Sequence, residues 1–345
     1  MRPVERDPLR PARRAARSVL RSPAVRRVGR RVLRPTAGAR AFVARWSSAR
    51  AGLALMYHRV DPTPLGPAHD LVPTVATADF DAQLRHLAAK YRVVPAGDLH
   101  AAVRARRRGQ RFPVAVTFDD DLASHRSIAL PLLRDHGLPA TVFLCGASLD
   151  GPGAFWWERL ERGARLGVDP AAALPGGGRR PAASSDIHAV AAVIEALPPQ
   201  ARRAVAEDLL ERVGPDPDDA GLRADDVAAL AAGGVEIGFH TRDHDRLPDL
   251  DDAALAAALV DGRAELADAA GLGLGRPVDV LAYPHGRADT RVAAAARRAG
   301  YRAAFTTDAA PVVPSSDPLL LPRVDPSWTS PADFPWWLHR QLRRG

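Results

Sequence analysis

Short apolar runs rich in β-branched residues alternate along the chain with longer segments whose apolar positions recur at helical spacing. This alternation predicts buried strands separated by amphipathic helices, which is typical of a parallel sheet or barrel. The expected strands are residues 52–60, 91–94, 114–118, 140–145, 235–239, 278–283, 303–306 and 319–324. The expected helices are residues 79–90, 99–107, 128–136, 224–232, 253–270 and 292–300.

The alternation is interrupted between residues 151 and 223, where the sequence contains no strand-like run. An aromatic cluster, residues 155–157, precedes a short helical segment, and a longer helix is expected over residues 187–213. The cluster is either a lid over a site or a small core of its own. We interpret residues 151–223 as a mostly helical insertion in an α/β domain that spans residues 51–325.

The first 50 residues differ sharply in charge from the rest of the chain. Residues 1–50 carry fifteen arginines against only Glu5 and Asp7, a charge of +13. The whole chain carries +8, so the remaining residues carry −5 and are mildly acidic. The basic character is thus confined to residues 1–50, and the acidic remainder argues against a specific nucleic-acid-binding face on the folded domain. We interpret residues 1–50 as a flexible tail, with peripheral contact to an anionic membrane as the alternative.

Other features of the composition exclude whole classes of protein. No apolar stretch reaches the roughly 18 residues that a membrane-spanning helix needs, and no signal-like apolar segment follows the first arginines. A single cysteine, Cys145, excludes an internal disulfide and a cysteine-rich zinc site. We therefore expect a cytoplasmic protein, with the inner face of the membrane as a second location. An aromatic, basic helix is expected within residues 326–345.

Three consecutive carboxylates, Asp119, Asp120 and Asp121, stand at the end of the expected strand at residues 114–118. Crowding like charges is costly unless a cation lies there or one group holds a proton. The carboxyl ends of strands in α/β folds are also where active sites collect. Alternatively, one aspartate caps the following helix and the others are solvated. This stretch alone does not decide between the two interpretations.

Histidines follow two later strands at the corresponding position. His240 and His244 come directly after residues 235–239, and His285 follows residues 278–283. In a parallel barrel these strand ends meet the aspartates at one mouth. Two imidazoles four residues apart can reach one ion if the segment turns helically. Together with one carboxylate they make a site suited to zinc. Asp120 can supply that carboxylate, leaving Asp119 as a free base beside it.

The same segments resemble the motifs of the polysaccharide deacetylase family, carbohydrate esterase family 4, and in particular its chitooligosaccharide deacetylase-like members. Residues 117–120, Thr-Phe-Asp-Asp, resemble the first motif, T-F-D-D-G, and residues 240–244 resemble the second, H-[ST]-x-x-H. Residues 281–286 are similar to a variant of the third, R-x-P-Y-G, and residues 137–144 fit the strand after the first motif. The resemblance extends over about residues 51–325, apart from the insertion.

This resemblance implies a distorted (β/α)7-type barrel and a divalent metal, Zn²⁺ foremost, bound by Asp120, His240 and His244. It implies that Asp119 is the general base and that the backbone N–H of His285 contacts the oxyanion. The implied activity is removal of an acetyl group from an N- or O-acetylated sugar by metal-activated water. The acetylated carbohydrate is a polysaccharide, an oligosaccharide or a lipid- or nucleotide-linked precursor.

The sequence also departs from the family motifs. Asp121 stands in place of the glycine of the first motif, and Ala282 in place of the arginine that normally tethers the base. We expect Arg323, at the end of the last strand, to take over that tether. The late L-x-H motif that supplies the general acid is absent, so His285 is our leading candidate for this role and His125 the second.

Four further side chains are expected around the metal ligands rather than on the metal, namely His58, Asp121, His125 and Thr241. Thr241 is expected to position its loop. Two other functions stay open. One is a deformylase or another C–N hydrolase of the same family. The other is a catalytically weak carbohydrate-binding barrel, suggested by the missing acid motif. The intact ligand set disfavours the second, because clustering polar groups is costly without a function that requires it.

Overall fold

Seven parallel strands form the frame of the computed structural model, which describes residues 46–151, 153–174, 186–273 and 277–344. They are β1 (Leu53–Tyr57), β5 (Pro113–Asp119), β6 (Thr141–Leu144), β7 (Glu236–Phe239), β8 (Val280–Ala282), β9 (Ala303–Phe305) and β10 (Arg323–Val324). Their order in the sheet is β10-β1-β5-β6-β7-β8-β9. An eighth strand, β4 (Arg92–Val93), pairs with the N-terminal end of β5, and β6 pairs with its C-terminal end.

The two ends of this sheet meet and nearly close it into a barrel. Phe305 of β9 pairs in parallel with Leu321, and the backbone N–H of Thr306 donates to the Leu321 carbonyl at 2.8 Å. Two residues further on, Arg323 pairs with Ala54 of β1, at the other end of the sheet. The predicted distorted seven-stranded (β/α) barrel is therefore confirmed.

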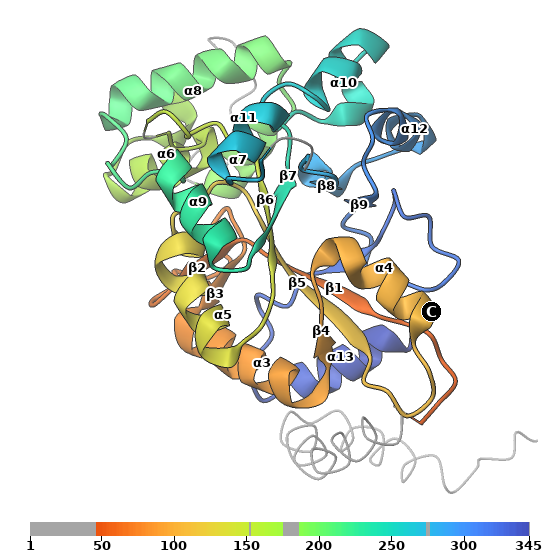
Figure 1. The fold of residues 1–345 in the computed structure, drawn as a ribbon. Helices are drawn as coiled ribbons and strands as arrows, with labels where there is room; N and C mark the ends of the chain where they lie inside the picture. Colours follow the sequence, from red (N-terminus) through yellow and green to blue (C-terminus); the bar gives the residue numbers. More distant parts are fainter. Residues whose placement is uncertain (1–45, 152, 175–185, 274–276, 345) are drawn as a thin grey trace, which may run out of the picture.

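Helices surround the barrel (Figure 1), and α13 lies beside α3, where the ring centroids of Phe334 and His86 are 5.9 Å apart. They are α3 (Thr77–Lys90), α4 (Ala96–Ala105), α5 (Leu130–His136), α9 (Ala224–Ala232), α10 (Asp252–Ala258), α11 (Arg263–Ala269), α12 (Thr290–Arg298) and α13 (Phe334–Leu342). The strands alternate between two apolar clusters. Ala54, Phe143 and Phe305 belong to the smaller cluster, whereas Leu53 and Leu55 belong to the larger one. Because both faces are covered, every residue of β5 is buried.

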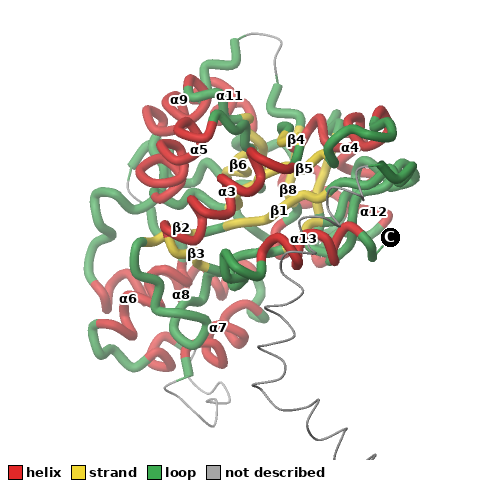
Figure 2. The backbone as a smooth tube through the Cα atoms, turned by 90° about the horizontal axis from the view of Figure 1, so that it is seen from below, coloured by secondary structure: helices red, strands yellow, loops and turns green. Residues whose placement is uncertain are grey.

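The insertion is a separate group of helices on one side of the sheet, as Figures 1 and 2 both show. It contains α6 (Trp156–Arg165), the short turn η2 (Pro170–Ala173), α7 (Ile187–Glu195) and α8 (Pro199–Val213). No strand occurs in the described part of residues 151–223, as predicted. These helices share a small core of their own that includes Leu160, Val190, Ile194, Val205 and Leu209.

Two long predicted helices are wrong in their continuity, because each is two shorter helices. The helix predicted over 187–213 ends at α7 and restarts at Pro199, since a proline ring removes the N–H that a continuing helix needs. The helix predicted over 253–270 is interrupted at Gly262, which has a φ of 85° and separates α10 from α11. A glycine adopts this left-handed conformation without steric cost.

The first predicted strand, residues 52–60, is wrong beyond residue 57. β2 (Arg59–Asp61) leaves the barrel and pairs in parallel with β3 (Thr74–Ala76), a strand that the sequence pattern did not reveal. Val60 is buried in the larger apolar cluster, although its strand pairs outside the barrel sheet. Its apolar character predicted burial correctly but could not identify the sheet that its strand joins.

The ends of the chain also differ from expectation. The last strand, predicted over residues 319–324, is reduced to β10 and the bridge at Leu321, because Pro322 has no N–H to donate to a neighbouring strand. The tail predicted over residues 1–50 lies almost wholly outside the described residues, so its membrane contact stays a prediction. None of the helices that the structure describes is long and apolar enough to cross a membrane.

Candidate active site

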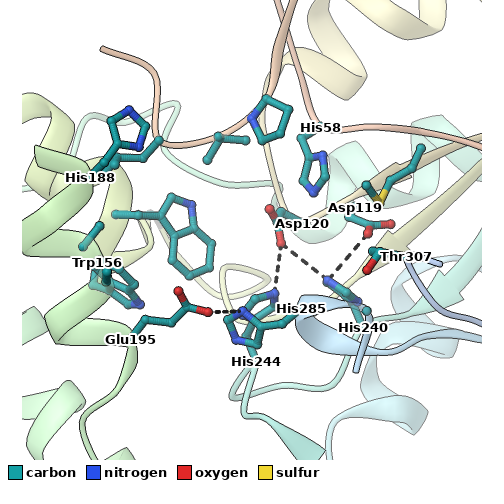
Figure 3. A pocket seen from close by; sticks show the side chains of 18 residues that line it. His58, Asp119, Asp120, Trp156, His188, Glu195, His240, His244, His285 and Thr307 are labelled. Atoms are coloured by element: carbon teal, nitrogen blue, oxygen red, sulfur yellow. Dashed lines mark ion pairs between the residues drawn. The ribbon is translucent and has the colours of Figure 1, made fainter. Parts of the chain in front are cut away.

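Six of the ten predicted site residues line one cavity of about 350 Å³ at the carboxyl ends of the strands (Figure 3), namely His58, Asp119, Asp120, His240, His244 and His285. β5 supplies Asp119 and Asp120, β7 leads into His240 and His244, and β8 leads into the short turn η4 (Pro284–Gly286). This convergence follows from the parallel topology, because the carboxyl ends of all the barrel strands lie at the same mouth.

The backbone of these segments is held in an uncommon conformation. Asp120, Thr241, His244 and His285 have φ between 50° and 73°, and no other non-glycine residue in the described ranges has positive φ. Such residues are strained by about 1–3 kcal/mol each and persist only where the surrounding structure enforces them. All four lie in the segments with family motifs, so the strained positions coincide with the candidate site.

Asp120, His240 and His244 form a group with the geometry of a metal site. Asp120 Oδ1 lies 3.7 Å from His240 Nε2 and 3.6 Å from His244 Nε2, and all three ligand atoms lie within 4.8 Å of one another. Ligands about 2.1 Å from one tetrahedral ion would be about 3.4 Å apart. Asp120 Oδ1 is also buried with no hydrogen-bond partner among the described residues. These three residues therefore fit a divalent cation.

The protonation of both histidines suits metal binding as well. The Nδ1 of His240 lies 2.8 Å from the carbonyl of Ala282, which can only accept, so this nitrogen carries the proton and Nε2 is free. Burial lowers the pKa of His240 to about 4 and holds the pKa of His244 well below its usual range. Burial, with Asp119 and Asp121 nearby, raises the pKa of Asp120 well above its usual range. A cation would reverse that shift.

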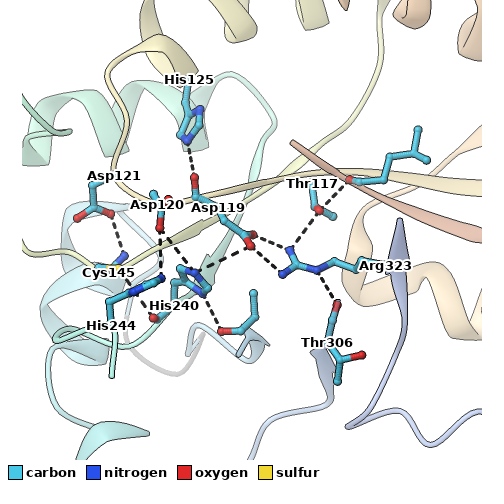
Figure 4. Close-up of polar contacts among 12 residues, drawn as sticks. Thr117, Asp119, Asp120, Asp121, His125, Cys145, His240, His244, Thr306 and Arg323 are labelled. Atoms are coloured by element: carbon cyan, nitrogen blue, oxygen red, sulfur yellow. Dashed lines mark hydrogen bonds and ion pairs between the residues drawn. The ribbon is translucent and has the colours of Figure 1, made fainter. Parts of the chain in front are cut away.

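Asp119 is held differently from Asp120, by a buried arginine (Figure 4). Arg323 donates from Nη1 to Asp119 Oδ1 at 2.6 Å and from Nη2 to Oδ2 at 2.7 Å. Its Nε donates to the carbonyl of Thr306 at 3.1 Å, and its side chain is fully buried. Burial alone would raise the pKa of Asp119, but the charges of Arg323 and His240 outweigh it and lower that pKa to about 2. The structure thus brings together the base and the arginine proposed to tether it.

Of the surrounding residues, Asp121 and His125 have structural partners, whereas the Thr241 hydroxyl has none among the described residues. The Asp121 carboxylate accepts from the backbone N–H of Cys145 at 2.8 Å and of Ala147 at 2.9 Å, so it fixes the loop after β6 and points away from the ligands (Figure 4). His125 Nε2 lies 3.0 Å from the Asp119 carbonyl, and the ring is buried outside the cavity. Thr241 is buried, and its hydroxyl has no partner among the described residues.

His58 and His285 line the cavity on different sides. His58 lies near Asp119, and its Nδ1 is buried without a hydrogen-bond partner in the described ranges. His285 packs edge-on against His244, with ring centroids 4.7 Å apart. Its Nδ1 lies 2.9 Å from Glu195 Oε1, so Nδ1–H donates, and the buried Nε2 has no partner among the described residues. The hydrogen bond from His285 lowers the pKa of Glu195 to about 2.

Residues 183–304, about a third of the chain, match the sequence profile of the family described as polysaccharide deacetylase. The match includes the segments at 240–244 and 281–286, on two of the strand ends that build the site. The matched family is the one that the motifs at residues 117–120 and 240–244 resemble. No curated protein sequence matches it.

Three solved structures share the fold of this chain. Streptococcus pyogenes deacetylase PplD in complex with acetate is 16% identical, with a TM-score of 0.57 over 86% of this chain and 100% of its own. IcaB from Ammonifex degensii is 19% identical, with a TM-score of 0.52 over 86% and 98%. The putative polysaccharide deacetylase BA0330 from Bacillus anthracis is 19% identical, with a TM-score of 0.53 over 85% and 69%. At these identities the likeness concerns the fold.

The insertion forms one wall of the cavity, which the sequence pattern only partly indicated. Trp156, His188 and Glu195 lie opposite Asp119 and Thr307 (Figure 3). The aromatic cluster flagged in the sequence thus contributes to the site, and the insertion also has its own core. Nothing in the sequence marked Glu195, because a single glutamate on an expected helix is ordinarily solvated.

Proposed function

We propose that the protein removes the acetyl group from an N- or O-acetylated sugar, with Asp119 as the general base beside a metal held by Asp120, His240 and His244. The observation that carries this proposal is the contrast between two adjacent carboxylates. Asp119 is neutralised by Arg323, whereas Asp120 presents a buried, unpartnered oxygen to two neutral imidazoles. This difference suits Asp119 as the base and Asp120 as the metal ligand.

A divalent cation in this site, Zn²⁺ foremost, would acidify a water and polarise the acyl carbonyl. Asp119 then accepts the proton of the attacking water. With a pKa of about 2, Asp119 is ionised at neutral pH and is a weak base on its own. The Asp119 carboxylate would therefore mainly orient the attacking water before it accepts the proton. The two-point contact with Arg323 supports this role because it fixes the plane of the carboxylate.

The developing oxyanion needs a donor, and we assign this role to the backbone N–H of His285. His285 has a φ of 57° in the turn η4, at the rim of the cavity. A backbone donor held by a strained turn is already oriented before the reaction, so it stabilises charge without reorganising. The neighbouring Gly286 lies so close to Thr307 that a Cβ there would be 2.1 Å from the Thr307 hydroxyl, which keeps this turn tight.

A departing amine also needs a proton, and the His285 side chain is our proposed donor. Glu195 fixes its Nδ1, which leaves Nε2 for the leaving group. His58 is the second candidate, because it lines the cavity beside Asp119 with an unpartnered ring nitrogen. His125, the second candidate from the sequence, lies outside the cavity and is bonded to the Asp119 carbonyl, so we withdraw that assignment.

The cavity itself favours a sugar substrate. Its volume of about 350 Å³ lies in the range of small-molecule sites. Trp156 and Trp157 supply flat apolar surface. Asp119, Asp120 and His240 supply polar groups across the cavity from Trp156 (Figure 3). This combination suits the apolar ring face and the polar rim of one acetylated sugar unit.

Acetate release is the direct test. The purified protein is incubated with an N-acetylated chitooligosaccharide and with an activated acetyl ester, before and after chelation and after Zn²⁺ is restored. We expect acetate from both substrates, loss on chelation and recovery with Zn²⁺. Release of formate from an N-formyl sugar instead would favour the deformylase. Sugar binding by calorimetry without release of any acyl group would favour the binding protein.

A further inference from the structure

The insertion contacts the loop that presents the candidate metal ligand His244. Residues 243, 245 and 246 of this loop each form an ion pair with a residue of α7 or α8. The pairs are Asp243 with Arg203, Asp245 with Arg202, and Arg246 with Glu195. The sequence separation within them is about 40 to 50 residues, so the insertion folds back onto the barrel loop at three successive points.

Arg202 occupies the centre of this contact. Its Nη2 donates to Asp245 Oδ1, and its Nη1 donates to the backbone carbonyl of Glu195 at 3.3 Å. One guanidinium thus joins the end of α7, the start of α8 and the loop. Its side chain is 11% exposed and that of Asp245 is 13% exposed, so water screens this pair only slightly.

The neighbouring pair differs in burial and not in chemistry. Arg203 and Asp243 are also an arginine and an aspartate, but their side chains are 63% and 58% exposed. An exposed pair contributes little because solvent screens the charges. The two adjacent arginines of α8 therefore form a natural comparison between a buried and an exposed contact with the same loop.

His244 depends on its loop more than His240 does. The carbonyl of Ala282 holds the ring of His240, but no acceptor in the described ranges holds His244 Nδ1 in the same way. The His244 backbone, with a φ of 50°, is strained, and its ring packs against Trp157 of the insertion with centroids 5.1 Å apart. The position of this ring is therefore determined by the loop conformation and by the packing around it.

We propose that Arg202 is a positioning residue for the metal site: through Asp245 it fixes the loop that places His244, and the insertion thereby sets the metal affinity. The proposal rests on the metal site of the proposed function. Removing the contact releases a strained loop, and residues that orient metal ligands typically contribute 10–100-fold to metal affinity.

The test compares Arg202→Gln with the matched control Arg203→Gln in the full chain. Zn²⁺ affinity is measured by competition with a chromophoric chelator, and the Co²⁺ absorption spectrum reports the ligand geometry. We expect Arg202→Gln to bind Zn²⁺ about 10-fold or more weakly with an altered Co²⁺ spectrum. Arg203→Gln should stay within about 2-fold of wild type.

Asp245→Asn removes the same contact from the loop side and covers the case in which Arg202→Gln fails to fold. It should weaken Zn²⁺ binding similarly, and the double variant should show no added loss. Hydrogen exchange of residues 241–246 in the metal-free protein should be faster in both single variants. Wild-type Zn²⁺ affinity in a folded Arg202→Gln or Asp245→Asn protein would overturn this inference alone. Absence of Zn²⁺ binding by wild type would overturn the proposed function as well.

Discussion

Replacing Arg323 by methionine tests the tether on the candidate base. Methionine keeps much of the side-chain volume and removes the guanidinium, so the two hydrogen bonds of 2.6 and 2.7 Å to Asp119 are lost with little change in packing. The bond of 3.1 Å to the Thr306 carbonyl is lost too. Asp119 is then a buried carboxylate with no cation bonded to it.

The structure allows the size of this effect to be worked out. Removing one partner of a buried ion pair costs about 3–5 kcal/mol in the free energy of unfolding, because the remaining charge is uncompensated. The pKa of Asp119, now about 2, rises because burial then acts largely unopposed. Since the folded pKa lies below that of an unfolded aspartate, this stability is present above about pH 4 and lost as the pH falls toward 2. Urea denaturation at pH 7 therefore detects it in full.

Activity should fall as well, by about 10²–10⁴-fold in kcat/KM, because a base that is no longer oriented loses most of its advantage. Both quantities are measured on the metal-loaded protein with an activated acetyl ester. The matched control is Arg297→Met, which removes an exposed pair with Asp317 and should cost at most about 1 kcal/mol. Wild-type activity and stability in Arg323→Met would refute the tether.

Three more tests use other side chains of the site and its surroundings. His285→Gln should lower kcat on N-acetyl sugars about 10²-fold or more and spare activated acetyl esters, which need no acid. Equal loss on both substrates would contradict that role. Selective loss on N-acetyl sugars in His58→Gln would assign the proton donor to His58. Trp156→Ala should raise KM about 10-fold with kcat unchanged if it binds the sugar ring; a fall in kcat alone argues against this. Burial lowers the pKa of His125 to about 4, so in wild type protonation of the unfolded chain costs about 2 kcal/mol of stability between pH 7 and 5. His125→Gln should be less acid-sensitive by that amount in urea denaturation, and identical pH dependence would contradict it.

The sequence predicted the barrel and the gathering of Asp119, Asp120, His240 and His244, because both follow from local patterns. Each residue stands directly after an apolar run, and parallel topology alone brings strand ends to one mouth. The position of Arg323 could be predicted by the same reasoning, since it stands on the last strand of a sheet that closes on itself. The roles of these residues remain proposals for experiment.

The contributions of the insertion were beyond sequence reasoning. Glu195 contacts His285, and Arg202 contacts Asp245, across sequence separations that no periodicity encodes. The break at Pro199 also separates α7, which ends with Glu195, from α8, which carries Arg202, and both residues contact the loop at 241–246. Similarly, Val60 showed that an apolar residue predicts burial without identifying the sheet that its strand joins.

The most direct measurement of the central claim compares Asp119→Asn with Asp120→Asn for bound Zn²⁺ and for acetate release. Both carboxylates are buried and adjacent, and asparagine preserves their shape. The account predicts that Asp119→Asn retains about one Zn²⁺ per chain and loses acetate release, whereas Asp120→Asn loses the metal together with activity. Equal metal content in both variants, or full acetate release by Asp119→Asn, would contradict the assignment of base and ligand.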